Sequence, residues 1–284
     1  AAVTRVSKNA GMLLLGTVLR MVFTFAFVIF AARYLGVEGY GKYALTQHLF
    51  ELGLSLSATG LGILVTREVA KNSEWLSRHL APAGALCVLL ACCAAGMLAI
   101  FAQLAGYAAD TRTAILVSTA ALVPATLCGL AEAIIVAYEK AEWVAVGVGV
   151  ESVVRTALCF LALLMGYGLV TLFVVLIFTR WAQLGIYVLL LARRLPTIHW
   201  RLSVAMLWSL IREWKVFAAE TWVATLYLAL DVIVLSLIWG EAAVGLYDAA
   251  WKLIRVGPVV GQRFTTAVFP YMSRLYVDAQ DTFH

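Results

Sequence analysis

Eleven charged side chains lie within stretches of the chain that are otherwise apolar, and they are the residues best suited to bind or move a charged ligand. An ionised group in an apolar medium is costly, so it pairs with an opposite charge or faces a polar cavity. Cations in such a cavity attract anions, whereas acids pair with the cations or couple an ion to transport. The cations are Arg20, Arg155, Arg180, Lys252, Arg255 and Arg263, and the acids are Glu51, Glu132, Glu151, Glu220 and Asp231.

Helical spacing predicts how some of these charges pair. Glu151 and Arg155 are four residues apart, in the Glu-before-Arg order that favours an ion pair, so they form either a self-neutralised pair or part of a site. Glu132 is expected to pair with Arg20 or with Arg155, and the spacing leaves that choice open. Arg20 itself has no neighbour of opposite charge on its own helix, so we expect it to line the cavity, as we do Arg180.

Two neighbouring segments near the end of the chain carry charged faces of opposite sign. Lys252 and Arg263 are eleven residues apart and point within about 20° of each other on a helix, with Arg255 roughly 60–80° from both. Glu220 and Asp231 are also eleven residues apart, on the helix before. These faces either pair within one helical hairpin or present cations to an anionic substrate.

One further acid and one histidine add to the candidates. Asp248 is the one acid placed to join the cationic face around Lys252. His48 and Glu51 are three residues apart on one predicted helix, where they form either a proton site or an interfacial pair.

The composition identifies the kind of protein that holds these charges. Of the 284 residues, 63% are hydrophobic and 13% are charged, and the mean hydropathy is +0.94. Average soluble domains are about 45–50% apolar and about 25% charged, so this chain has too few charges to cover a soluble surface. The same figures exclude disorder, collagen and a small disulfide scaffold. What remains is a polytopic membrane protein.

The apolar runs predict an all-α bundle of about eight transmembrane helices. Continuous runs are typical of helices, whereas a membrane β-barrel would alternate over segments of about ten residues. After the sixth helix, residues 195–213 read as an amphipathic helix at the membrane surface, or else as an ordinary basic loop. The predicted helices span roughly 11–33, 43–66, 81–105, 113–137, 143–165, 168–192, 214–239 and 244–270.

The basic residues outside the helices predict the orientation. If the first residue is cytoplasmic, the outer loops hold three basic residues and the inner segments hold twelve, which is the positive-inside bias. Residue 284 is then cytoplasmic too, and the net charge of +5 reflects orientation in the inner membrane, not binding to nucleic acid. The inner residues are Arg5, Lys8, Arg67, Lys71, Arg78, Lys140, Arg193, Arg194, Arg201, Arg212, Lys215 and Arg274.

A short pattern occurs twice, 204 residues apart. Residues 36–43 and 240–247 both read G-x4-G-x-Y, and each lies between two long predicted helices. Glycine suits a tight turn between antiparallel helices because it tolerates positive φ. The pattern predicts an internal repeat, with residues 1–194 as a first lobe, 195–213 as a linker, and 214–284 as the start of a second lobe.

Three stretches carry a resemblance to a known family. ARYLGVEGYGKYAL (32–45), LGILVTREVAK (61–71) and GEAAVGLYDAAWKL (240–253) resemble the polysaccharide transporters of the MOP superfamily, of the O-antigen flippase type. Members have 12 or 14 helices in two lobes and move undecaprenyl-pyrophosphate-linked oligosaccharide from the inner to the outer leaflet. The resemblance implies that this chain holds the first lobe and the first hairpin of the second, so its length departs from the family.

The predicted function is therefore lipid flipping for polysaccharide export by alternating access, and not enzymatic catalysis. The resemblance implies a lipid-linked oligosaccharide as substrate and makes other polysaccharide assembly proteins candidate partners. One alternative is a drug or cation antiporter of the same superfamily, although its cavity should be acidic. Another is a membrane enzyme such as a polymerase or ligase. The sequence has no Walker A, GxSxG or HExxH motif, so it suggests no cofactor and no metal.

Overall fold

The computed structural model describes residues 2–58, 60–138, 140–192 and 204–254, and for residues 2–24 and ten further positions in α3 and α8, Glu220 among them, it describes the backbone alone. Every regular element in this part of the chain is an α-helix, which confirms the all-α membrane bundle. The helices are α1 (Ala2–Ala58), α2 (Leu61–Lys71), α3 (Ser73–Leu104), α4 (Ala109–Thr119), α5 (Leu122–Ala137), α6 (Ala141–Leu164), α7 (Leu169–Ala192) and α8 (Val204–Ile254).

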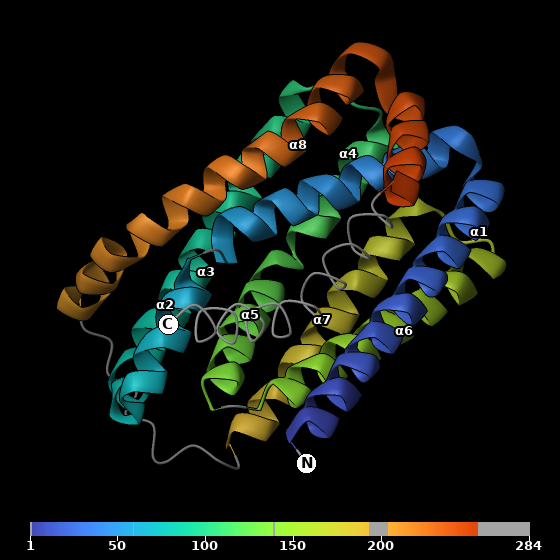
Figure 1. The fold of residues 1–284 in the computed structure, drawn as a ribbon. Helices are drawn as coiled ribbons and strands as arrows, with labels where there is room; N and C mark the ends of the chain where they lie inside the picture. The colour runs from blue at the N-terminus through green and yellow to red at the C-terminus, as the bar shows by residue number, and fades with distance from the viewer. Residues whose placement is uncertain (1, 59, 139, 193–203, 255–284) are drawn as a thin grey trace, which may run out of the picture.

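The two longest helices, α1 and α8, each bend sharply at a glycine. Gly36 has φ 73° and Gly240 has φ 79°, a region that residues with a Cβ atom rarely adopt. These glycines open the two copies of the G-x4-G-x-Y pattern, so each copy marks a bend between two helical arms. Figure 1 shows the arm of α1 after its bend running beside the arm of α8 before its bend.

The helix boundaries differ from the prediction in several places, and the predicted helix 113–137 is divided between α4 and α5. The predicted pair 11–33 and 43–66 falls in α1 and α2, and the pair 214–239 and 244–270 falls in α8 as far as residue 254. The described residues hold six segments long and apolar enough to cross a membrane, so the count of about eight is not confirmed. Residues 204–213 of the predicted linker run into α8 without a break, while 195–203 lie outside the described residues.

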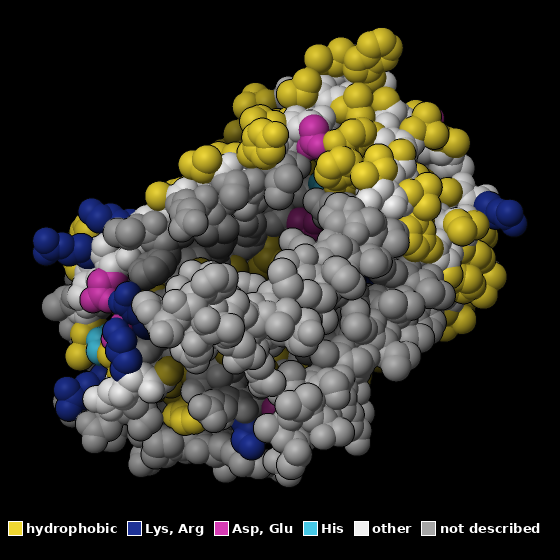
Figure 2. All heavy atoms as spheres, in the orientation of Figure 1, with side chains coloured by type: hydrophobic (Ala, Val, Ile, Leu, Met, Phe, Trp, Pro, Cys, Tyr) yellow, Lys and Arg dark blue, Asp and Glu magenta, His cyan; other side chains and the backbone are white. Residues whose placement is uncertain are grey.

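Apolar side chains occupy both the interior and the surface of the bundle. The largest buried cluster draws on every helix except α2, and it includes residues such as Leu45, Phe50 and Phe173. Many large apolar side chains are nevertheless exposed, and Figure 2 shows them spread over the upper and right-hand parts of this face. Lipid chains surround a membrane-spanning bundle, so these residues lie where the hydrocarbon solvates them.

Exposed basic residues gather at one end of the bundle. Figure 2 shows Lys and Arg side chains at the left, where α2 meets α3 and α8 begins. Arg67 of α2 lies 4.0 Å from Glu213 of α8 there. The bends at Gly36 and Gly240 lie at the opposite end (Figure 1). The exposed basic residues of this end are Arg67, Lys71, Arg78, Arg212 and Lys215.

The two copies of the repeated pattern pack directly against each other. A Cβ atom on Gly41 would lie 1.9 Å from the backbone oxygen of Glu241, and one on Gly245 would lie 3.0 Å from the Cα of Gly41. Only glycine permits this approach of two helix backbones. The second glycine of each copy therefore sets the distance between α1 and α8 near their bends.

Candidate functional site

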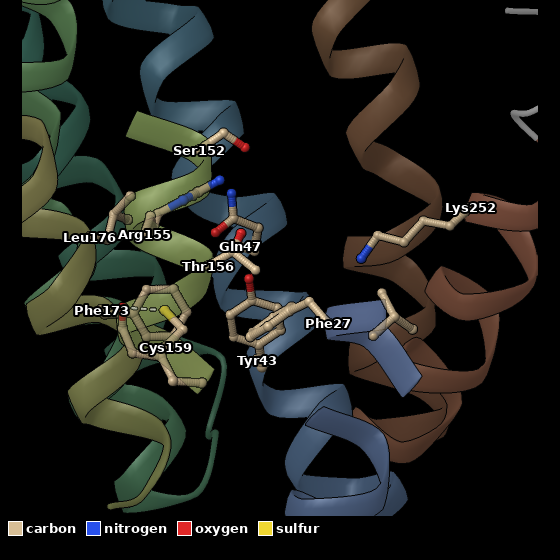
Figure 3. A pocket seen from close by; sticks show the side chains of 12 residues that line it. Phe27, Tyr43, Gln47, Ser152, Arg155, Thr156, Cys159, Phe173, Leu176 and Lys252 are labelled. Atoms are coloured by element: carbon tan, nitrogen blue, oxygen red, sulfur yellow. Dashed lines mark hydrogen bonds between the residues drawn. The ribbon is translucent and has the colours of Figure 1, made fainter. Parts of the chain in front are cut away.

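A small polar pocket lies where α1, α6, α7 and α8 meet, with a volume of about 80 Å³. Figure 3 shows Arg155 of α6 on one side of it and Lys252 of α8 on the other, with Gln47 and Tyr43 of α1 between them. The pocket thus brings together two cations that are 97 residues apart in the sequence. Its other lining residues are Phe27, Val28, Ser152, Thr156, Cys159, Leu172, Phe173 and Leu176.

Arg155 is held by an acid one helical turn earlier. Its Nε lies 3.5 Å from Glu151 Oε1, which is the i,i+4 pair that the spacing predicts. The Glu151 side chain is 5% exposed, whereas that of Arg155 is 26% exposed. Thr179 of α7 donates a hydrogen bond of 3.3 Å to the same carboxylate oxygen, and Arg180 Nε lies 3.9 Å from it. The Glu151 carboxylate is therefore buried, whereas the Arg155 side chain lines the pocket.

Lys252 is held in the same way, but by a cluster that joins α8 to α1. Its Nζ donates to Asp248 Oδ2 at 2.6 Å and to the Tyr40 hydroxyl at 3.1 Å. Asp248 also accepts from the Tyr40 hydroxyl at 2.5 Å, and its Oδ1 lies 2.9 Å from His48 Nε2. Asp248 is 2% exposed, whereas the Lys252 side chain is 28% exposed. We call Tyr40, His48, Asp248 and Lys252 the α1–α8 polar cluster.

The geometry of the pocket suits the binding of an anion. Both cations are partly exposed and face one cavity, and each forms an ion pair with a buried acid at i−4. Gln47, Ser152 and Thr156 add neutral hydrogen-bonding groups between them. Among the described residues no group of three or more His, Cys, Asp or Glu could hold a metal ion.

A model of the family described as polysaccharide biosynthesis protein matches residues 6–276. The chain belongs to this family. The family is one of the MOP superfamily, and a solved structure supports that fold: an inward-facing multidrug resistance MATE family transporter of the MOP superfamily, at 14% identity and a TM-score of 0.59. The match covers 91% of this chain and 63% of the transporter, so the chain spans under two-thirds of that length. A search of curated proteins finds no match.

In this member of the polysaccharide biosynthesis family, a second polar network joins α5 to α7. Glu132 accepts hydrogen bonds from the Tyr187 hydroxyl at 3.1 Å and from Gln183 Nε2 at 3.4 Å. Gln183 also accepts one from Arg180 at 2.8 Å. The predicted alternative in which Glu132 pairs with Arg155 is therefore not observed. Arg180 lies in this network beside Glu151, and not on the wall of the pocket.

Two other predicted pairings are not observed, because these residues contact other partners. The His48–Glu51 pair is wrong, because His48 contacts Asp248 and Glu51 accepts a hydrogen bond from Gln47 at 2.9 Å. Glu51 lies on the wall of a shallow groove at the junction of α1 and α2. Asp231 does not pair with Lys252, since it accepts a hydrogen bond from the Tyr247 hydroxyl.

The remaining predicted residues are placed only in part. Arg20 lies in α1 and Glu220 in α8, and their side chains are outside the described part of the structure. Arg255 and Arg263 lie outside the described residues altogether. Tyr40 and Gln47 were missed by the sequence analysis, because an uncharged polar residue in an apolar helix gives no signal until a distant partner is known.

Proposed function

We propose that this chain takes part in flipping an undecaprenyl-pyrophosphate-linked oligosaccharide across the inner membrane by alternating access. The observation that carries the proposal is the pair of cations, Arg155 and Lys252, that face one pocket from different helices. A pyrophosphate carries about two negative charges, and two cations at the sides of one cavity match it. The membership of the polysaccharide biosynthesis family supports a sugar-linked lipid as cargo.

The internal acids explain how such a cavity stays stable without cargo. A buried cation without a partner is strongly unfavourable, and Glu151 and Asp248 supply that partner from one helical turn away. When an anion binds, it adds negative charge to cations that are already compensated. This favours a moderate affinity, which a transporter needs in order to release its cargo. Arg20, Arg255 and Arg263 remain proposed contributors to the same cationic cavity.

The orientation follows from the basic end of the bundle. We infer that the end with Arg67, Lys71, Arg78, Arg212 and Lys215 faces the cytoplasm, because basic residues favour the cytoplasmic side of a membrane. The bends at Gly36 and Gly240 then lie toward the outer leaflet.

A second function has its own support. A drug or cation antiporter would use buried acids, and this chain has Glu151 and Asp248 buried and Glu132 partly buried. The MATE transporter fold fits that role equally. In this structure, however, Glu151 and Asp248 each contact a cation of the pocket at 3.5 Å and 2.6 Å. The acids are therefore partly neutralised, while the cations are the groups that reach the cavity. A polymerase or ligase has less support, because the family and the similar fold are those of transporters.

The test measures binding of inorganic pyrophosphate to the chain in lipid nanodiscs. Replacing Arg155 and Lys252 together by Gln should weaken binding of pyrophosphate by at least about tenfold, or 1.4 kcal/mol, because the pocket loses both of the cations that attract the anion. Arg78→Gln with Arg212→Gln is the matched control, since it removes two exposed cations outside the pocket. Unchanged binding in the pocket variant would refute the proposal. Binding of a lipophilic cation that is lost on Glu151→Gln would instead favour the antiporter.

A further inference from the structure

An apolar groove lies on the outside of the bundle, between the first arm of α1 and α6. Its walls include Ala26, Val153, Ala157, Leu161 and Leu164, which are all exposed. Beside it the rings of Phe30 and Phe160 stack with centroids 3.7 Å apart, which joins the two helices there. Because α6 is one of the segments able to span the membrane, the mouth of this groove lies in the hydrocarbon region.

The groove and the polar pocket share two residues. Phe27 and Thr156 line both cavities, so the pocket and the groove lie on the two sides of the same α1–α6 contact. Figure 3 shows both side chains directed into the pocket region, close to Tyr43 and Gln47. A ligand with a polar head in the pocket and an apolar chain would have its chain beside this contact.

A second lipid-facing groove lacks this connection. It lies between α6 and α7 and is lined by residues such as Trp143, Val150, Phe178 and Ile186. Among the described residues it shares none with the polar pocket. Bulk lipid chains fit either groove, but a ligand anchored by an anionic head in the pocket reaches only the α1–α6 groove by a short path.

We propose that the α1–α6 groove binds the first part of the prenyl chain of the cargo, next to its pyrophosphate. This inference rests on the proposed function, since the head of the same molecule occupies the polar pocket. The chain contacts Phe27 and Ala157 while the phosphates lie between Arg155 and Lys252. The groove then selects a lipid-linked pyrophosphate over a free one, because burial of apolar surface adds to the binding of the charges.

The experiment compares inorganic pyrophosphate with farnesyl diphosphate, a short prenyl diphosphate, on the chain in nanodiscs, with empty nanodiscs subtracted. Wild type should bind the prenyl compound at least about tenfold more tightly. Ala157→Phe fills the groove and should remove that gain without weakening binding of inorganic pyrophosphate, because Ala157 does not line the pocket. Ala182→Phe, the same change at an exposed position in the α6–α7 groove, is the matched control and should keep the gain.

The possible outcomes separate this inference from the proposed function. If wild type binds neither compound, the proposed function fails. If it binds both equally, or if Ala157→Phe keeps the gain, the groove holds only bulk lipid and the inference is overturned. A photoreactive prenyl diphosphate gives a second measurement that needs no substitution: labelling of α6 near Val153 and Leu161 supports the inference, and labelling confined to α7 overturns it.

Discussion

The α1–α8 polar cluster provides the most demanding test of the structure. Asp248 accepts from Tyr40 at 2.5 Å and from Lys252 at 2.6 Å through one oxygen, and contacts His48 at 2.9 Å through the other. Asp248→Asn keeps the shape of the side chain but removes its charge. One of its two terminal atoms becomes a donor, so the variant loses an acceptor and leaves Lys252 without its buried counter-ion.

The expected cost follows from these contacts. Breaking a buried ion pair by changing one partner costs about 3–5 kcal/mol. Lys252 is 28% exposed and is partly solvated after the change, so we expect about 2–3 kcal/mol. For a chain of this size that corresponds to a fall in melting temperature of roughly 5–10 °C. Asp231→Asn is the matched control on the same helix, because Asp231 is exposed, and it should cost under about 1 kcal/mol.

The assay is thermal unfolding of the purified chain, followed by tryptophan fluorescence, for both single variants and for a double-mutant cycle with Lys252→Met. The Asp248→Asn and Lys252→Met changes should be less than additive by about 1–3 kcal/mol, because each removes the same ion pair. An Asp248→Asn variant that unfolds at the same temperature as Asp231→Asn would refute the cluster as a link between α1 and α8.

Two further predictions concern close packing and buried hydrogen bonds. Gly41→Ala should destabilise the chain by about 1–3 kcal/mol, because its Cβ would lie 1.9 Å from the Glu241 backbone oxygen; Gly96→Ala, with nothing within 4 Å, should be neutral or stabilising in the same unfolding assay. Glu132→Gln should cost under about 1 kcal/mol since it keeps an acceptor for Tyr187, whereas Glu132→Ala should cost about 2–4 kcal/mol by leaving buried donors unsatisfied. Equal melting temperatures within either pair of variants would contradict the packing described.

Local features of the sequence were sufficient for the class of protein and for contacts within one helix. Hydropathy alone predicted an all-α membrane protein, although not the number of its helices, since lipid requires long apolar helical runs. The Glu151–Arg155 pair followed from a spacing of four residues, because the helix itself brings such side chains together. The repeated G-x4-G-x-Y pattern marked both helix bends, because the need for positive φ at Gly36 and Gly240 is a property of the local backbone.

The tertiary structure decided which charges face one another. His48 contacts Asp248 from 200 residues away, so the nearer Glu51 was the wrong partner to expect. Lys252 and Arg155 share a pocket only because α8 and α6 both pack against α1. Spacing along a helix fixes the direction of a side chain but not the neighbour that it meets. That neighbour depends on how closely two helices approach, which here is set by Gly41 and Gly245 at the contact of α1 with α8.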